Sequence, residues 1–183
     1  MSDDGILIGG REKRPIVLED WDQRWVERFE QERERIVRAL GEVVRRIEHV
    51  GSTSVTGLAA KPIVDIQLSV ADVEDEAFYV PPMEAAGYVL RVREPGHRMF
   101  RTPDIGVQIH FCTSGSDWER RHLLFRDWLR RSSEDRVRYE ASKRELARRE
   151  WDDVNDYADA KSTVIKKISE RAESWAAATG WSL

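Results

Sequence analysis

The sequence predicts an α+β fold, in which a mixed, mainly antiparallel sheet is preceded by one N-terminal helix and followed by a C-terminal set of three helices. Three observations lead to this class. Aromatic and aliphatic residues recur at helical spacing over residues 21–40. Short apolar runs with strand-like alternation then occupy much of residues 43–112, and helical periodicity dominates from residue 116 onward. No internal repeat and no linker between domains is visible in the sequence.

Length and composition indicate one domain that can bury a real core. The chain has 183 residues, of which 40% are hydrophobic and 35% are charged, as is typical of a globular protein with a heavily charged surface. Residues 1–14 are polar, charged and contain glycine. We therefore expect a loose N-terminal arm over residues 1–14 and a single domain over residues 15–183.

Charge, cysteine content and hydropathy argue against several classes of protein. The formal net charge of −4 makes a general nucleic-acid-binding protein unlikely to fit this sequence. The single cysteine, Cys112, has no partner for an internal disulfide, which suits a reducing compartment. No apolar run approaches the ~18 residues of a membrane span, and no apolar segment of a secretory signal begins the chain. We expect a cytoplasmic protein that does not bind membranes.

The N-terminal helix is expected to occupy residues 21–40. Asp20 precedes it as an N-cap residue, and Gly41 follows it as a terminating residue. Residues 15–18, before the helix, are short and apolar enough for an edge strand.

The first two core strands are expected over residues 43–50 and 63–70. Side chains alternate along a strand, so the second strand should place its aliphatic residues on one face. Asp65, Gln67 and Ser69 would then share the other face.

The later elements follow the same reasoning. They are a helical region interrupted by Pro81 and Pro82, a hairpin of residues 88–92 and 98–101, a strand over residues 107–112, and helices from residue 116, over residues 133–149 and over residues 153–178. Gln108 and His110 share one face of the last strand. Ser116 and Glu119 have the spacing of a capping box at the start of the first C-terminal helix.

One stretch, residues 47–70, combines features of a phosphate-binding site. A strand-like run breaks at Gly51 and Ser52, where the backbone can approach a ligand closely. The N–H groups of residues 52–54 would point at an anion near the start of a short helix. Asp65 lies fourteen residues after Gly51, inside an apolar strand where an unpaired carboxylate is costly. Either a structural partner satisfies Asp65, or Asp65 faces a polar site.

The same stretch resembles the signature of the GrpB family, whose fold is that of the nucleotidyltransferase superfamily. The resemblance covers about residues 17–175. The residues that carry it are Glu48 to Thr53, Gly57 to Pro62, Asp65 and Ile66, Gly87 and Tyr88, Ile109 to Phe111, Leu124 to Arg130, Tyr139 with Lys143, and Tyr157 with Lys161. The resemblance implies a nucleotidyltransferase-like fold.

Nucleotidyl transfer, as the resemblance implies it, needs a phosphate cradle and carboxylates that hold Mg²⁺. Gly51, Ser52 and Thr53 would form the cradle, and Asp65 would be a catalytic residue and a ligand of Mg²⁺. The superfamily has a second acid two residues later, where this chain has Gln67. The strand that would supply a third acid offers Gln108 and His110 instead. This departure puts ordinary two-metal catalysis in doubt, because Mg²⁺ prefers anionic oxygen ligands.

Three roles remain open for Asp65. It could ligate a single Mg²⁺ bridged to a nucleotide, it could bind a ribose or a basic group without metal, or it could pair with Lys61 or an arginine. His110 should lie beside Asp65 and could act catalytically as a proton carrier. An alternative is a transition-metal site of Asp65, His49 and His110, because imidazole suits Zn²⁺ or Mn²⁺ better than Mg²⁺.

Basic residues are expected to neutralise the phosphates. Lys143 and Lys161 each follow a tyrosine by four residues, so each pair shares one helix face. The phosphate- or nucleotide-binding set expected from the sequence comprises Gly51, Ser52, Thr53, Lys61, Gln67, Arg98, Lys143, Tyr157 and Lys161. Arg126 ranks lower, because neighbouring carboxylates could pair with it.

Two functions follow from this reasoning. The first is a nucleotidyltransferase-like enzyme that binds a nucleoside triphosphate or a similar phosphorylated ligand and transfers a nucleotidyl group to a small molecule. The second is a non-catalytic nucleotide- or anion-binding module that has lost the two-metal site. Members of the family also occur fused to dephospho-CoA kinase, which suggests a link to coenzyme A or nucleotide metabolism. RNA binding through the arginine-rich helices is the weakest alternative, because acidic residues are interspersed there.

Overall fold

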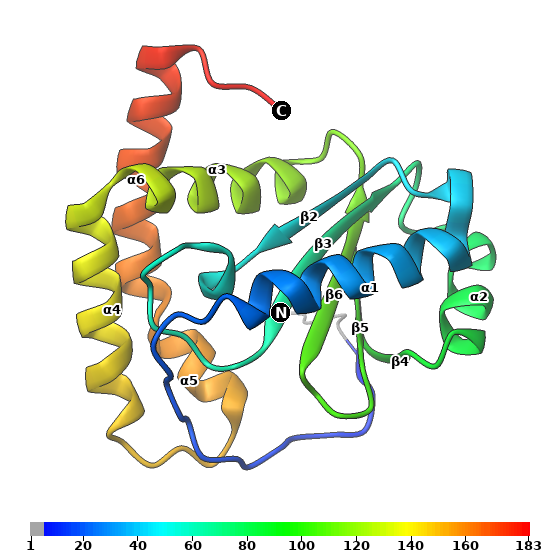
Figure 1. The fold of residues 1–183 in the computed structure, drawn as a ribbon, viewed down its shortest axis with the longest axis horizontal. Coiled ribbons are helices and arrows are strands. Elements are labelled where there is room, and N and C mark those ends of the chain that lie inside the picture. Colours follow the sequence, from blue (N-terminus) through cyan, green and yellow to red (C-terminus); the bar gives the residue numbers. More distant parts are fainter. Residues whose placement is uncertain (1–5) are drawn as a thin grey trace.

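The computed structural model describes residues 6–183, and its centre is a six-stranded mixed sheet in the order β1-β4-β5-β6-β3-β2 (Figure 1). Only β3 and β6 pair in parallel, and the other neighbours are antiparallel. The strands are β1 (Ile6–Leu7), β2 (Arg46–Val50), β3 (Val64–Val70), β4 (Val89–Glu94), β5 (His97–Arg101) and β6 (Val107–Thr113). The helices are α1 (Arg24–Leu40), α2 (Val80–Ala85), α3 (Asp117–Arg131), α4 (Ser133–Ala147), α5 (Val154–Ala160) and α6 (Ser162–Thr179).

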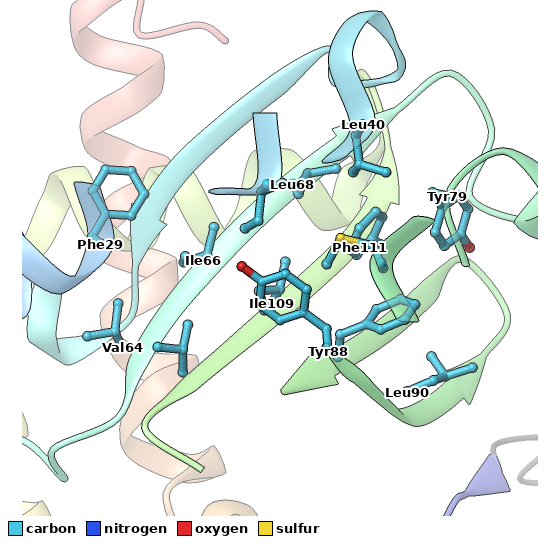
Figure 2. Close-up of a cluster of buried hydrophobic side chains, with 14 of the residues drawn as sticks. Phe29, Leu40, Val64, Ile66, Leu68, Tyr79, Tyr88, Leu90, Ile109 and Phe111 are labelled. Atoms are coloured by element: carbon cyan, nitrogen blue, oxygen red, sulfur yellow. The ribbon is translucent and has the colours of Figure 1, made fainter. Parts of the chain in front are cut away.

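One face of the sheet forms the main hydrophobic core under α1 and α2. Val64, Ile66 and Leu68 of β3 alternate toward this face, as do Ile109 and Phe111 of β6 (Figure 2). Aromatic and aliphatic side chains of α1 and α2 pack against these strands. Because strand side chains alternate, the polar residues between these apolar residues in β3 and β6 must lie on the opposite face.

α3 packs on that opposite face, and α4 and α6 lie side by side next to α3 (Figure 1). A second apolar cluster joins the loop after β2 to these helices. Its buried members are Val55, Leu58, Leu129, Tyr139 and Ile168. This cluster fixes the helices against the Gly51 loop and so determines the shape of the space between them.

The α+β class and the mixed sheet are confirmed, and each predicted core strand is present. The number of C-terminal helices was predicted wrongly, because the expected helix over residues 153–178 divides into α5 and α6 at Lys161. The predicted N-cap residue of α1 was also wrong. Asp22, rather than Asp20, accepts a hydrogen bond at the helix start, from the backbone N–H of Arg24 at 2.8 Å.

Part of the segment before α1 pairs with the sheet, which the sequence did not predict. Ile6 and Leu7 pair with β4, although they fall within the expected loose arm. Residues 1–5 of that arm lie outside the described residues. The edge strand expected at residues 15–18 is replaced by a single bridge between Glu19 and Ala60. Among residues 6–183, no helix combines the length and the apolar composition that crossing a membrane requires.

Candidate functional site

A cavity of about 390 Å³ opens between the polar face of the sheet and the C-terminal helices. The Gly51 loop, β3 and β6 form its floor, and residues from α3 to α6 form its wall. This cavity is called the lysine hollow below, after the three lysines that line it: Lys61, Lys143 and Lys161. Its size is within the range of small-molecule sites, which are typically about 300–1,000 Å³.

The loop that begins the lysine hollow depends on Gly51. Gly51 has φ +70° and ψ −175°, a conformation that essentially only glycine adopts. A Cβ atom added there would lie 3.1 Å from both Cβ and Cγ of Asp65, and closer still to its carboxylate oxygen Oδ2. The loop and the acid are therefore in direct contact, although fourteen residues separate them in the sequence.

The residues after Gly51 form a single 3₁₀ turn, Ser52–Ser54. The N–H of Ser54 donates to the carbonyl of Gly51 at 3.2 Å, and the Ser54 hydroxyl donates to the same oxygen at 2.6 Å. The N–H of Ser54 is thus committed to the turn, contrary to the expectation that it points at an anion. Ser52 and Thr53 line the lysine hollow.

Lys143 reaches the cradle from α4. Its ammonium group lies 3.0 Å from the Ser52 hydroxyl, donates to the carbonyl of Ala59, and lies over the Tyr139 ring at 4.8 Å. The side chain is almost fully buried, with 2% of the residue exposed. Burial, reinforced by the nearby charge of Lys161, lowers the pKa of Lys143 to about 7.

Lys61 and Lys161 flank a second tyrosine. Their ammonium groups lie over the Tyr157 ring at 5.4 Å and 4.8 Å. Burial lowers the pKa of both lysines, and the neighbouring Lys61 adds to the effect on Lys161, whose pKa falls to about 8. Burial also raises the pKa of Tyr157 to about 12. The Tyr157 hydroxyl is buried and finds no hydrogen-bond partner within residues 6–183.

The opposite wall is aromatic and imidazole-rich. His110 Nε2 lies 3.4 Å from Asp65 Oδ1, so the predicted neighbourhood of these two residues is observed. Trp118 and His122 of α3 also line the hollow, with ring centroids 3.6 Å apart. Sequence reasoning missed both residues. Their i,i+4 spacing in the first turns of the helix that the capping box begins was the signal that could have found them.

Arg98 does not belong to this site. It lies on β5 beside Phe111, on the core side of the sheet, and its guanidinium donates to Glu74 at 2.6 Å and to Glu76 at 2.5 Å. The prediction that Arg98 binds phosphate failed because a strand residue's face depends on register, which the sequence left open. Arg126 is also engaged elsewhere, with Glu48 at 2.7 Å.

His49 and Gln67 are likewise outside the lysine hollow. His49 faces α1, where it stacks on Phe29 with ring centroids 5.0 Å apart, and burial lowers its pKa to about 4. Its Nε2 lies 2.9 Å from the Thr53 hydroxyl. Gln67 points to the polar face but is 1% exposed, and its two amide atoms have no partner within the described residues.

The donor set fits neither a two-metal Mg²⁺ site nor the three-residue transition-metal site considered from the sequence. Asp65 is the single carboxylate that lines the lysine hollow, within the part of the chain that the structure describes. The proposed triad of Asp65, His49 and His110 is divided between the two faces of the sheet. Residues 6–183 contain no group of three histidine, cysteine or acidic side chains placed to hold a metal ion. A two-metal Mg²⁺ site needs more anionic oxygens than this cavity offers.

Comparisons with known proteins agree with this architecture. A family model described as GrpB protein matches residues 15–171. A UPF0157 protein of Streptomyces coelicolor is 52% identical over 166 residues, covering 91% of this chain and 89% of that protein. A dephospho-CoA kinase of Mycolicibacterium paratuberculosis is 29% identical over 198 residues, covering 92% of this chain and 49% of that protein.

A solved structure shows the same overall fold. The crystal structure of conserved protein GrpB from Enterococcus faecalis matches with a TM-score of 0.76 and 31% sequence identity, covering 87% of this chain and 99% of that chain. The family model also spans most of the sequence. This chain therefore belongs to the GrpB family.

Proposed function

We propose that the lysine hollow binds the phosphate groups of a nucleotide or a related phosphorylated small molecule. The observation that carries this proposal is the convergence of three desolvated ammonium groups on a cavity with one carboxylate. With all three lysines protonated, the three positive charges and one negative charge leave a local excess of +2, in a chain whose net charge is −4. Clefts lined by one sign of charge concentrate ligands of the other sign.

Without a ligand, keeping the buried lysines of the hollow protonated costs free energy. Like charges and desolvation both disfavour protonation of Lys143 and Lys161, as their lowered pKa values show. A phosphate group would supply the missing negative charge and several acceptor oxygens. Charge-assisted hydrogen bonds of this kind are roughly twice as strong as neutral ones. The Tyr157 hydroxyl, which has no hydrogen-bond partner among residues 6–183, offers one more donor on the same wall.

We also propose that the fold is nucleotidyltransferase-like and that the ligand is a nucleotide. The cradle of Gly51 and Ser52, followed by Asp65 on the next strand, supports this identification. So does the similarity to a protein named dephospho-CoA kinase, whose name indicates a phosphorylated, nucleotide-containing substrate. Transfer of a nucleotidyl group is the second candidate. It is favoured by one observation, the imidazole of His110 beside the Asp65 carboxylate.

Calorimetric titration with ATP and with tripolyphosphate tests the binding proposal. Lys161→Met removes one ammonium group from the hollow and should weaken both ligands about 10-fold, the equivalent of one charge-assisted contact of about 1.4 kcal/mol. Lys166→Met is the matched control, because Lys166 lies five residues later, on helix α6, and is exposed. No binding to the wild type, or an equal loss in the control, would contradict the proposal.

The direction in which Asp65→Asn changes the affinity for phosphate separates metal-free from metal-dependent binding. Without a metal, the Asp65 carboxylate repels phosphate, so Asp65→Asn should strengthen tripolyphosphate binding severalfold. If Mg²⁺ bridged Asp65 to the ligand, the same variant would weaken binding only in the presence of Mg²⁺. We expect the first result, because Asp65 is the single carboxylate among residues 6–183 that lines the hollow.

A further inference from the structure

Four side chains form a continuous line of polar contacts from the lysine hollow to the surface. Asp65 Oδ1 lies 3.4 Å from His110 Nε2, and His110 Nδ1 lies 3.0 Å from His97 Nε2. His97 Nδ1 then lies 3.0 Å from Glu94 Oε2. The Glu94 side chain is 50% exposed, whereas that of His97 is 12% exposed. The line thus begins in the cavity, passes through half-buried imidazoles and ends in solvent.

The two imidazoles meet edge to edge. Their planes differ by 13° and their centroids lie 5.3 Å apart, close to the N···N distance plus the two ring radii. Trp118 covers both rings, with its centroid 5.0 Å from that of His97 and 5.8 Å from that of His110. The indole shields the contact between the imidazoles from water on this side. Shielded hydrogen bonds have more definite geometry and greater electrostatic strength.

For two neutral imidazoles, the shorter contact at Glu94 and the longer one at Asp65 favour one placement of the protons. Glu94 is an acceptor, so His97 carries its proton on Nδ1 and presents the bare Nε2 to His110. His110 must then donate from its own Nδ1, which leaves its Nε2 bare toward Asp65 and the hollow. A bare nitrogen and a carboxylate repel each other, which accounts for the long 3.4 Å separation at that end.

We propose that His97 and His110 form a proton relay from the lysine hollow to Glu94, in which His97 is a positioning residue that keeps His110 Nε2 free to act as a base. The inference rests on the proposed function for the source of the proton, a hydroxyl group or water brought beside the bound phosphorylated ligand.

The relay balances as three successive proton transfers, one along each hydrogen bond of the line. The hydroxyl gives its proton to His110 Nε2, and the proton on His110 Nδ1 passes to His97 Nε2. The proton on His97 Nδ1 passes to the Glu94 carboxylate, which releases it to solvent. One proton leaves the hollow and one appears at the surface. The Asp65 carboxylate accepts a hydrogen bond from Nε2–H while that nitrogen is protonated.

The surroundings limit the pair to one additional proton. Two added protons would place the His97 Nε2–H and His110 Nδ1–H groups against each other. The charged and titratable groups that face the pair are Asp65 from β3, Glu94 from β4 and His122 from α3, and the charge of Arg98, on the core side of β5, also acts on His97. Burial, and next the nearby His110, lower the pKa of His97 to about 4, in agreement with a neutral His97 near neutral pH.

Nitrogen-15 NMR of the imidazoles tests the relay without requiring a substrate. Near neutral pH, the wild type should show both His97 and His110 as the Nδ1–H tautomer, and acidification should add one proton to the pair before the protein unfolds. His97→Ala should shift His110 away from the Nδ1–H tautomer. His97→Gln should restore that tautomer, because the amide oxygen can accept from His110 Nδ1.

His122→Gln is the control, because His122 stacks on Trp118 outside the line of contacts. It should leave the His110 tautomer unchanged. The Nε2–H tautomer at His110 in the wild type, or independent uptake of two protons, would overturn the relay. Titration of His97→Ala with tripolyphosphate separates this proposal from phosphate binding. Unchanged affinity together with a changed tautomer supports the relay, and changed affinity with an unchanged tautomer refutes it.

Discussion

Replacement of Gly51 by alanine tests the contact on which the site is built. Two penalties follow from the structure. The backbone conformation, φ +70° and ψ −175°, costs a non-glycine residue about 1–3 kcal/mol. The new Cβ would also lie 3.1 Å from Cβ and Cγ of Asp65, and the displacement of a packed side chain costs about 1–3 kcal/mol.

The two penalties together predict a loss of about 3 kcal/mol in the free energy of unfolding. For a chain of this length, that loss corresponds to a fall of about 6–12 °C in Tm, at roughly 2–4 °C per kcal/mol. Urea unfolding monitored by tryptophan fluorescence measures the first quantity, and calorimetry measures the second. Affinity for tripolyphosphate should fall as well, because the carboxylate must move toward the phosphate position.

Gly57→Ala provides the matched control. Gly57 also has a positive φ, +80°, but a Cβ there would meet nothing within 4 Å. It should therefore show only the backbone penalty, about 1–2 kcal/mol, and it should leave phosphate binding unchanged. If Gly51→Ala lowers the free energy of unfolding no more than Gly57→Ala does, the close contact between the Gly51 loop and Asp65 does not contribute to the penalty, and the prediction is refuted. In the Asp65→Ser background, the Gly51→Ala penalty should shrink by about 1 kcal/mol.

Three further predictions concern neighbouring residues. Arg98→Met should cost about 2 kcal/mol in urea unfolding, because it removes the arginine paired with Glu74 and one of the two arginines paired with Glu76, yet tripolyphosphate affinity should not change. Gln67→Met should be neutral or stabilising in the same assay, since both amide atoms are buried without partners within residues 6–183. The pKa of Lys143 is about 7 in the folded chain, below the 10.5 of an ordinary lysine, so the unfolded chain binds more protons between these two values. The free energy of unfolding should therefore rise between pH 7 and 9, by about 2 kcal/mol from this residue, and Lys143→Met should abolish that rise.

The sheet could be predicted from the sequence because its signals are local. Alternation in residues 64–70 correctly assigned aliphatic residues to one face and Asp65 to the other. The division of the last helix at Lys161 could not be predicted, since the apolar spacing continues across it. The backbone of Lys161 itself stays in a helical conformation, with φ −81° and ψ −10°, so the interruption is a single residue that no change in the hydrophobic pattern marks.

The part of the candidate site formed by the Gly51 loop and the lysines was predictable from the sequence, whereas the contact between the two histidines was not. The Gly51 loop, Lys143 and Lys161 came from the family resemblance and tyrosine spacing, and the structure places them around one cavity. His97 could not be found, because its partner His110 lies across a strand pair whose register places Met99, rather than His97, directly opposite. Arg98 was misassigned for the same reason. Register determines which side chains meet, and register depends on tertiary packing.

The apolar contacts around the lysine hollow explain why its charges are perturbed. Val55 and Leu58, directly after the cradle, pack against Leu129, Tyr139 and Ile168 of the C-terminal helices. This packing brings the α4 lysine to Ser52 and excludes water from its ammonium group. Stability and ligand affinity must then be coupled, because the packing that orders the helices also desolvates the lysines. A ligand that neutralises the lysines should relieve this cost, so phosphate binding should raise Tm more in the wild type than in Lys143→Met.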